Sequence, residues 1–152
     1  MGISLIAGLG NPGLQDESAG LNAVKRILKQ YPQNSLRYLL LGDSILHFPP
    51  LYRNEQKIVF ISSGYLGKYF GEHILCSLRE IDKEHKIIGI SDADIDTLVR
   101  EIPEIKSARV MLWAFQIHWN EWGDELSPEV SRAVKHLVHN FWHILEELNF
   151  VA

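Results

Sequence analysis

The strongest constraint on the fold is a set of four short runs that are almost continuously apolar. They are ISLIAGL (3–9), LRYLLLG (36–42), KIVFISS (57–63) and ARVMLWAFQI (108–117). Such runs predict strands of a sheet that is covered on both faces, because a solvent-exposed face would require a polar residue at every second position. A fifth run, EHILCSL (72–78), is more polar and is expected to form an edge strand or a short hairpin.

Helical patterns occupy the segments between these runs. From Leu21 to Leu28, apolar residues recur on one helical face, and residues 91–102 form a second helical segment. The last helix has the clearest signal, because Ser127 is a favoured N-cap and Pro128 suits the first helical position. The alternation of strands and helices predicts an α/β fold, a three-layer α/β/α sandwich with a mainly parallel sheet of the phosphorylase/hydrolase-like type.

Length, charge and cysteine content narrow the functional classes. At 152 residues the chain is expected to form one domain, residues 1–152, with a substantial core. The net charge of −4 argues against a nucleic-acid partner. No apolar run approaches the roughly 20 residues that cross a bilayer. The single cysteine, Cys76, excludes an internal disulfide and fits a reducing compartment. We therefore expect a cytoplasmic protein with no nucleic-acid or membrane partner.

The stretch LIAGLGNPGLQDESAGLNAV (5–24) joins the first predicted strand to the first helix through a glycine-rich loop. Ligands of parallel sheets bind beyond the carboxyl ends of the strands, where this loop must lie. Its glycines match the G-x-G-x-x-G spacing of dinucleotide-binding loops. Pro12, however, removes a backbone donor, and Asp16 and Glu17 put negative charge where a phosphate would sit. The loop therefore disfavours a dinucleotide site.

The same loop resembles the N-terminal motif of the maturation endopeptidases of nickel–iron hydrogenases, G-x-G-N-x-x-x-x-D-[DE]-x-x-G. The residues that meet this motif are Gly8, Gly10, Asn11, Asp16, Glu17 and Gly20. Two later segments resemble that family in the same order: IVFISSGYLGKYFGEHI (58–74) and WAFQIHWNEWGDELSPEVSRAVKHLV (113–138). The resemblance covers most of the chain and implies the fold of that family.

The resemblance also implies a function. Members of that family remove a C-terminal extension from the hydrogenase large subunit, and nickel supplied with the substrate directs the cleavage. Their three metal ligands are an acid of the first loop, an aspartate at the end of the third strand and a histidine before the next helix. Transferred to this chain, the first ligand is Glu17, the second position holds Ser62 or its neighbour Ser63, and the third lies near Ser91 with no histidine. Two of the three expected ligands are therefore absent.

Other residues of the expected crevice provide substitutes for the missing ligands. Asp43 follows the second predicted strand and Asp92 begins the second helical segment. A site of these two acids with Glu17 would contain only oxygen ligands, which suit a harder ion than nickel. Both acids also fit ordinary structural roles, in a turn and at a helix start. Asn11 and Asp16 are expected to line the same crevice as Ser62 and Ser91.

Two functional hypotheses follow from the resemblance. In the first, the chain is an endopeptidase that acts on a nickel-loaded hydrogenase large subunit. In the second, it is a diverged relative that binds this subunit or a similar protein without cleaving it. Trp119 and Trp122 lie in a predicted loop and are candidates for a partner-binding surface, because exposed aromatic residues are frequent hot spots of interfaces.

A third and more remote hypothesis concerns the hexapeptide GLGNPG (8–13), which also resembles the start of bacterial peptidyl-tRNA hydrolases. That family continues with a Thr-Arg-His-Asn segment whose histidine is the catalytic base. Residues 15–18 of this chain read Gln-Asp-Glu-Ser instead. The expected base is missing, and the negative net charge does not favour tRNA.

Overall fold

The computed structural model describes residues 2–151. Four strands form the parallel part of the sheet: β1 (Ser4–Leu9), β2 (Leu36–Gly42), β3 (Lys57–Tyr65) and β6 (Arg109–Gln116). Two shorter strands are antiparallel to their neighbours: β4 (His73–Ser77) pairs with β6, and β5 (Lys86–Ile87) pairs with β3. The order β2-β1-β3-β6-β4 leaves β2 and β4 at the two edges of the sheet.

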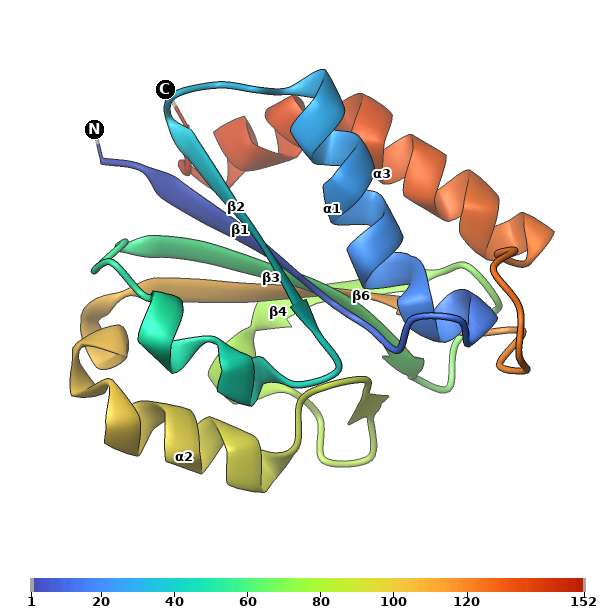
Figure 1. Ribbon diagram of the computed structural model, residues 1–152, viewed down its shortest axis with the longest axis horizontal. Helices are drawn as coiled ribbons and strands as arrows, with labels where there is room; N and C mark the ends of the chain where they lie inside the picture. Colours follow the sequence, from blue (N-terminus) through green and yellow to red (C-terminus); the bar gives the residue numbers. More distant parts are fainter. Residues whose placement is uncertain (1, 152) are drawn as a thin grey trace.

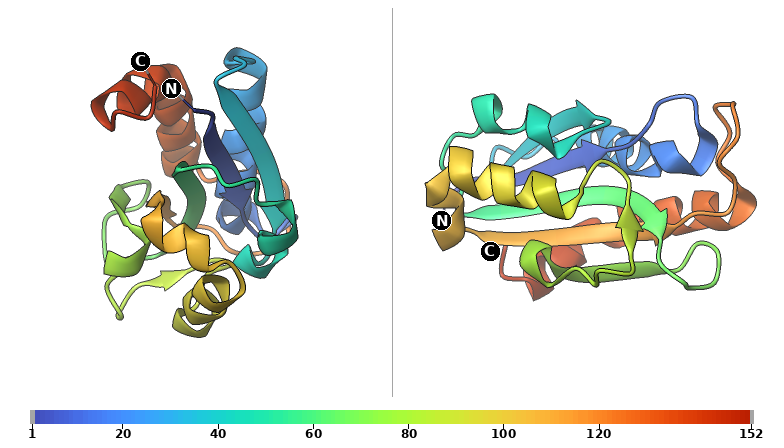
Figure 2. Two further views of the ribbon diagram at one scale, coloured as in Figure 1. Left: turned by 90° about the vertical axis from the view of Figure 1, so that its left-hand side faces the viewer. Right: turned by 90° about the horizontal axis from the view of Figure 1, so that it is seen from below.

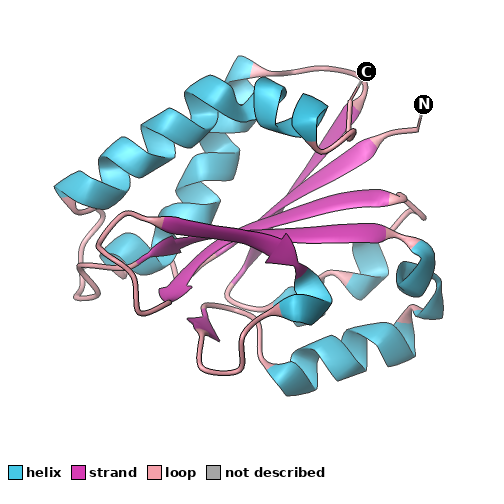
Figure 3. Ribbon diagram, turned by 180° about the vertical axis from the view of Figure 1, so that it is seen from behind, coloured by secondary structure: helices cyan, strands magenta, loops and turns pink. Residues whose placement is uncertain are grey.

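Helices cover both faces of this sheet (Figure 1). Helices α1 (Ala19–Gln30) and α3 (Pro128–Glu147) lie side by side on one face, and α2 (Asp92–Glu101) lies on the other. Short 3-10 helices connect the larger elements: η1 (Gln15–Ser18), η2 (Ile45–His47), η3 (Pro49–Leu51), η4 (Leu78–Glu80) and η5 (Pro103–Ser107). Figure 3 shows the sheet between the two helical layers. The predicted three-layer α/β/α sandwich with a mainly parallel sheet is confirmed.

The near-continuous apolar strands have a core on each side of the sheet. All six residues of β1 are buried. Ile6 packs in the core with Val24 of α1 and Phe141 of α3, whereas the preceding residue Leu5 packs with Leu98 of α2. Successive side chains of a strand point to opposite faces, so both are removed from water only when helices cover both faces.

One short strand depends on pairing that the sequence pattern does not show. The run at 72–78 forms β4, an edge strand as predicted, but the two-residue strand β5 was not predicted. It exists because Ile87 pairs with Gly64 of β3, a long-range contact without a local signal.

None of the helices within residues 2–151 combines the length and the apolar character that crossing a bilayer requires.

The carboxyl ends of β1, β3 and β6 lie at one end of the molecule, which we call the carboxyl edge. Three loops gather there, residues 10–18, 66–72 and 117–127 (Figure 2). Gly20, at the start of α1, allows this helix to pack closely against β3, because a Cβ at this position would lie 2.2 Å from the carbonyl oxygen of Ile61. The glycine that ends the sequence motif is therefore required by packing between α1 and β3.

Candidate functional site

The first loop and the loop after β6 form one hydrogen-bonded unit at the carboxyl edge. The amide of Gln15 donates to the carbonyl oxygen of Gly123 at 3.0 Å, and the amide of Gly123 donates to the carbonyl oxygen of Gly13 at 2.8 Å. The amide of Asp16 donates to the carbonyl oxygen of Trp119 at 3.0 Å. These backbone contacts hold together two segments that are about a hundred residues apart in sequence.

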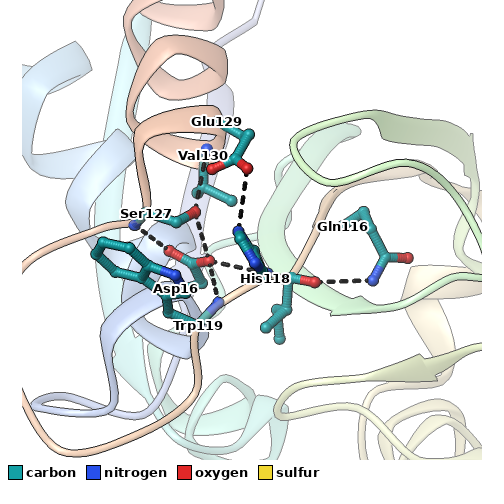
Figure 4. Close-up of polar contacts among 8 residues, drawn as sticks. Asp16, Gln116, His118, Trp119, Ser127, Glu129 and Val130 are labelled. Atoms are coloured by element: carbon teal, nitrogen blue, oxygen red, sulfur yellow. Dashed lines mark hydrogen bonds and ion pairs between the residues drawn. The ribbon is translucent and has the colours of Figure 1, made fainter.

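Asp16 forms the buried floor of this unit (Figure 4). Its side chain has no exposed surface. One carboxylate oxygen accepts from the amide of Ser127 at 2.8 Å. The other accepts from the amides of His118 at 2.9 Å and Trp119 at 2.8 Å, and from the hydroxyl of Ser127 at 2.7 Å. Asp16 therefore joins the two loops from a buried position. The prediction that Asp16 lines the crevice is wrong, because its side chain does not reach the surface.

Glu17 lies at the half-buried rim of the same unit. One of its carboxylate oxygens accepts from the side-chain amide of Asn11 at 2.8 Å, and the other accepts from the hydroxyl of Tyr65 at 2.9 Å. The side-chain amide of Asn120 in turn donates to the Tyr65 oxygen at 2.9 Å. Both oxygens of the expected first ligand are therefore occupied by neutral donors.

Tyr65 is held in its protonated form by this arrangement. Burial raises the pKa of its phenol above the ordinary value of 10.0; the hydrogen bond from Asn120 opposes this shift and the hydrogen bond to Glu17 adds to it. A protonated phenol can donate to a carboxylate, so the network of Asn11, Glu17, Tyr65 and Asn120 is complete at neutral pH.

Ser62 and Ser63 occupy the strand end where the family resemblance implies an aspartate. Both are buried. The hydroxyl of Ser62 donates to the carbonyl oxygen of Ile88 at 2.7 Å, which ties β3 to the segment after β5. The hydroxyl of Ser63 has no hydrogen-bond partner among residues 2–151. Both hydroxyls are neutral, so neither replaces a carboxylate well as a ligand of a transition ion.

Ser91 serves as the N-cap of α2. Its hydroxyl accepts from the amide of Asp94, and the carboxylate of Asp94 accepts from the amide of Ser91, each at 3.1 Å. This reciprocal pair is a capping box, so Ser91 has a structural role at the helix start. Asp92 occupies the first position of this helix and is exposed.

The predicted substitute site of Glu17, Asp43 and Asp92 is not assembled. Asp43 is exposed in the turn after β2. Within residues 2–151, no three side chains of His, Cys, Asp or Glu are placed so that they could hold a metal ion. The donor set of the carboxyl edge therefore does not fit nickel or a harder cation as the side chains are arranged.

Tyr65 and Asn120 belong to the site, although no motif of the sequence predicted them. Tyr65 lies two positions after Ser63 on the same strand, and residues two apart share a face of the sheet. That periodicity could have placed Tyr65 beside Glu17. Asn120 lies in a loop whose path is set by the contacts of Asp16, and its sequence neighbourhood carries no comparable signal.

Exposed aromatic side chains lie on two of the loops at the carboxyl edge. Tyr69, Phe70 and Trp122 are 85%, 51% and 83% exposed. Phe70 stacks on the imidazole of His118 with 3.9 Å between ring centroids, and Nδ1 of His118 lies 3.1 Å from a carboxylate oxygen of Glu129. A hollow of about 370 Å³, lined by Gln15 and residues 118–121, opens beside them. Of the two predicted surface tryptophans, Trp122 is therefore exposed, whereas Trp119 is partly buried.

The comparison with solved structures identifies the class of fold. No family model and no curated protein matches the sequence. The structure, however, resembles the [NiFe] hydrogenase maturation protease HybD from Thermococcus kodakarensis with a TM-score of 0.80 and 22% sequence identity, over 93% of this chain and 98% of that one. The fold is thus that of the hydrogenase maturation proteases, as the sequence motifs indicated.

Two further structures support the same assignment. The maturation protease HycI from Thermococcus kodakarensis KOD1 has a TM-score of 0.77 and 16% identity, over 95% of this chain and 92% of that one. The hydrogenase maturating endopeptidase HybD from E. coli has a TM-score of 0.76 and 17% identity, over 95% and 93%. At these identities the likeness establishes the fold.

Proposed function

We propose that the protein is a hydrogenase maturation protease-like protein that binds the large subunit of a nickel–iron hydrogenase, or a similar protein, at its carboxyl edge. In this proposal it recognises its partner without cleaving it. The fold and the motif residues of the first loop support the relationship. The arrangement around Glu17 supports recognition over proteolysis.

The observation that carries the proposal is the closed network around Glu17. Asn11 and Tyr65 occupy both carboxylate oxygens. Each oxygen keeps a further lone pair, so Glu17 could still contribute one ligand bond, but the neutral serines at the end of β3 would add no charge and no second or third ligand is grouped with it among residues 2–151. A site that recognises nickel through side-chain ligands requires more donors than this edge supplies.

The exposed aromatic rim supports a protein partner. Tyr69, Phe70 and Trp122 present large aromatic surfaces to solvent on two loops of the carboxyl edge. Aromatic side chains of this kind contribute much of the affinity at protein interfaces, because they bury a large area at a small cost in conformational entropy. Trp122 also lies against Gly13, so its ring extends the surface of the first loop.

Metal-directed endopeptidase activity is the second candidate function. One observation favours it: Glu17 keeps the motif position of the expected first ligand and is only half-buried, so a substrate-bound metal could reach it. In that case nickel would arrive with the hydrogenase subunit as part of the substrate, and Glu17 would provide the one negatively charged ligand of this chain.

One experiment separates the two functions. The protein is mixed with a purified large-subunit precursor that carries its C-terminal extension, in nickel-loaded and nickel-free forms. Calorimetry measures complex formation, and intact-mass spectrometry measures cleavage. We expect a complex with a Kd of about micromolar strength and no change in precursor mass. Trp122→Ala should weaken the complex about tenfold or more. Leu46→Ala, at an exposed residue of η2, provides the control and should leave the affinity unchanged.

Nickel-dependent cleavage that disappears in Glu17→Gln would replace recognition by the endopeptidase function. A precursor that neither binds nor loses mass would contradict both functions.

A further inference from the structure

A basic groove lies between α1 and α3, on the outer surface of the helical layer. Its volume is about 680 Å³, and its lining residues are Arg26, Lys29, Gln30, Lys135, Val138 and His139. Both walls are helical and present residues spaced three or four apart, so each wall is one continuous ridge. The lining residues from α1 lie in the C-terminal half of that helix, whereas the carboxyl edge adjoins its start.

The charge of this groove differs from that of the whole chain. The chain has 19 acidic residues and a net charge of −4. None of these acids falls within residues 18–42 or 130–145, which include all of α1 and most of α3. The salt bridges of residues 2–151 involve other side chains, so Arg26, Lys29 and Lys135 have no carboxylate within 4.0 Å. The groove therefore carries unneutralised positive charge on an acidic protein.

The floor of the groove is apolar and fixed. Val138 belongs to the hydrophobic core and has 7% of its surface exposed. Tyr31, at the end of α1, donates from its hydroxyl to the carbonyl oxygen of Val138 at 2.9 Å and stacks on Trp142. This hydrogen bond joins the two helices across the base of the groove. Cationic walls over an apolar floor define the chemistry of a ligand that is acidic on its flanks and apolar along one face.

We propose that the groove binds an acidic amphipathic helix of a partner protein. Such a helix would place apolar side chains over Val138 and carboxylates beside Arg26, Lys29 and Lys135, the helix-in-groove mode of peptide recognition. Nucleic acid fits less well, because phosphates would leave the apolar floor uncovered and the acidic remainder of the protein would repel the strand. The proposal concerns a surface separate from the carboxyl edge and does not depend on the function proposed there.

A model peptide tests this binding mode. The probe is a fluorescein-labelled peptide of about 18 residues, long enough to form a helix, with leucine at positions i, i+3, i+4 and i+7 and glutamate on its flanks. Fluorescence anisotropy measures its binding to the full chain. We expect saturable binding of this peptide and no binding of a peptide in which every glutamate is replaced by lysine.

A pair of charge-matched variants locates the binding surface. The double variant Lys29→Glu and Lys135→Glu should weaken peptide binding about tenfold or more, since it reverses both walls of the groove. The control variant Lys25→Glu and Lys83→Glu makes the same change in net charge at exposed positions outside the groove, and should change the affinity less than about twofold. Circular dichroism verifies that both variants are folded.

Three results would overturn the proposal. They are equal losses of affinity in the two double variants, no saturable binding of the glutamate peptide at about millimolar concentration, and tighter binding of an oligouridine RNA than of the peptide. The first would leave only long-range charge attraction, the second would remove the groove as a helix site, and the third would make its occupant a nucleic acid.

Discussion

The floor and the rim of the carboxyl edge contain neighbouring acids of one motif, yet the two acids have different surroundings. On the floor, Asp16 has no exposed surface and accepts hydrogen bonds from backbone amides and from one hydroxyl of the loop after β6. At the rim, Glu17 is half-buried and accepts only from the side chains of Asn11 and Tyr65. Asp16 therefore ties two loops together, whereas Glu17 is partly accessible to solvent.

Two residues of the motif therefore have structural roles that do not depend on peptidase activity. Asp16 fixes the loop that follows β6, and Gly20 permits α1 to approach β3. Both positions of the motif would be required in a protein without peptidase activity. Glu17, in contrast, is half-buried and contacts only side chains.

Removing the floor carboxylate should produce the largest effect. Asp16→Ala would leave the amides of His118, Trp119 and Ser127 without an acceptor in a buried site. Each unsatisfied buried donor costs about 1–3 kcal/mol, so we expect the free energy of unfolding to fall by at least about 3 kcal/mol. Urea denaturation measures this change.

Asp16→Asn provides the matched variant. An asparagine keeps one acceptor oxygen, but its amide group would face the donor of Ser127, so its loss of stability should lie between those of wild type and Asp16→Ala. A stability of Asp16→Ala within about 1 kcal/mol of wild type would show that the floor is not a stabilising tie.

Alkaline pH should act on the rim with an intermediate effect. The pKa of Tyr65 is raised above 10.0, chiefly by burial. Above pH 10 the unfolded chain loses this proton while the folded chain keeps it, so the unfolded state binds fewer protons and the free energy of unfolding decreases as pH rises. Burial also raises the pKa of Tyr38, to about 12, and Tyr38 therefore contributes to the same decrease.

The variant Tyr65→Phe isolates the contribution of the rim. It lacks the titrating group, so its free energy of unfolding should decrease less steeply with pH above 10 than that of wild type. Urea denaturation at several alkaline pH values measures both slopes. Identical slopes would mean that the Tyr65 phenol ionises equally readily in the folded and the unfolded chain.

Neutralising the rim carboxylate should have the smallest effect on stability. Glu17→Gln preserves the shape of the side chain and one acceptor oxygen, and the site is partly exposed to water, so we expect a change in the free energy of unfolding of less than about 1 kcal/mol. Thermal and urea denaturation check this. A loss as large as that of Asp16→Ala would remove the distinction between floor and rim.

Much of the fold could be predicted from the sequence because its signals are local. Continuous apolar character marked β1, β3 and β6, and the N-cap Ser127 with Pro128 marked the start of α3. The relationship to the maturation proteases was also accessible, since the spacing of the motif residues reflects close packing at the glycines and the tie at Asp16. The two-residue strand β5 was not accessible, because it depends on a partner distant in sequence.

The site itself was predicted only in part. The sequence placed Glu17, Ser62 and Ser91 near the ends of strands and helices, and it showed that two expected metal ligands are absent. It could not reveal that Asn11 and Tyr65 donate hydrogen bonds to the carboxylate of Glu17, because both hydrogen bonds depend on how the first loop and β3 are oriented in space.

The sequence by itself determined the layered architecture, the loop at the carboxyl edge and the charge of each helix, because periodicity, capping and composition are properties of short segments. The tertiary structure decided which of two adjacent acids is buried, which neutral side chains surround the other, and that α1 and α3 combine their cations in one groove. These outcomes depend on contacts between segments up to about a hundred residues apart, and the packing of the core, not the local sequence, sets such contacts.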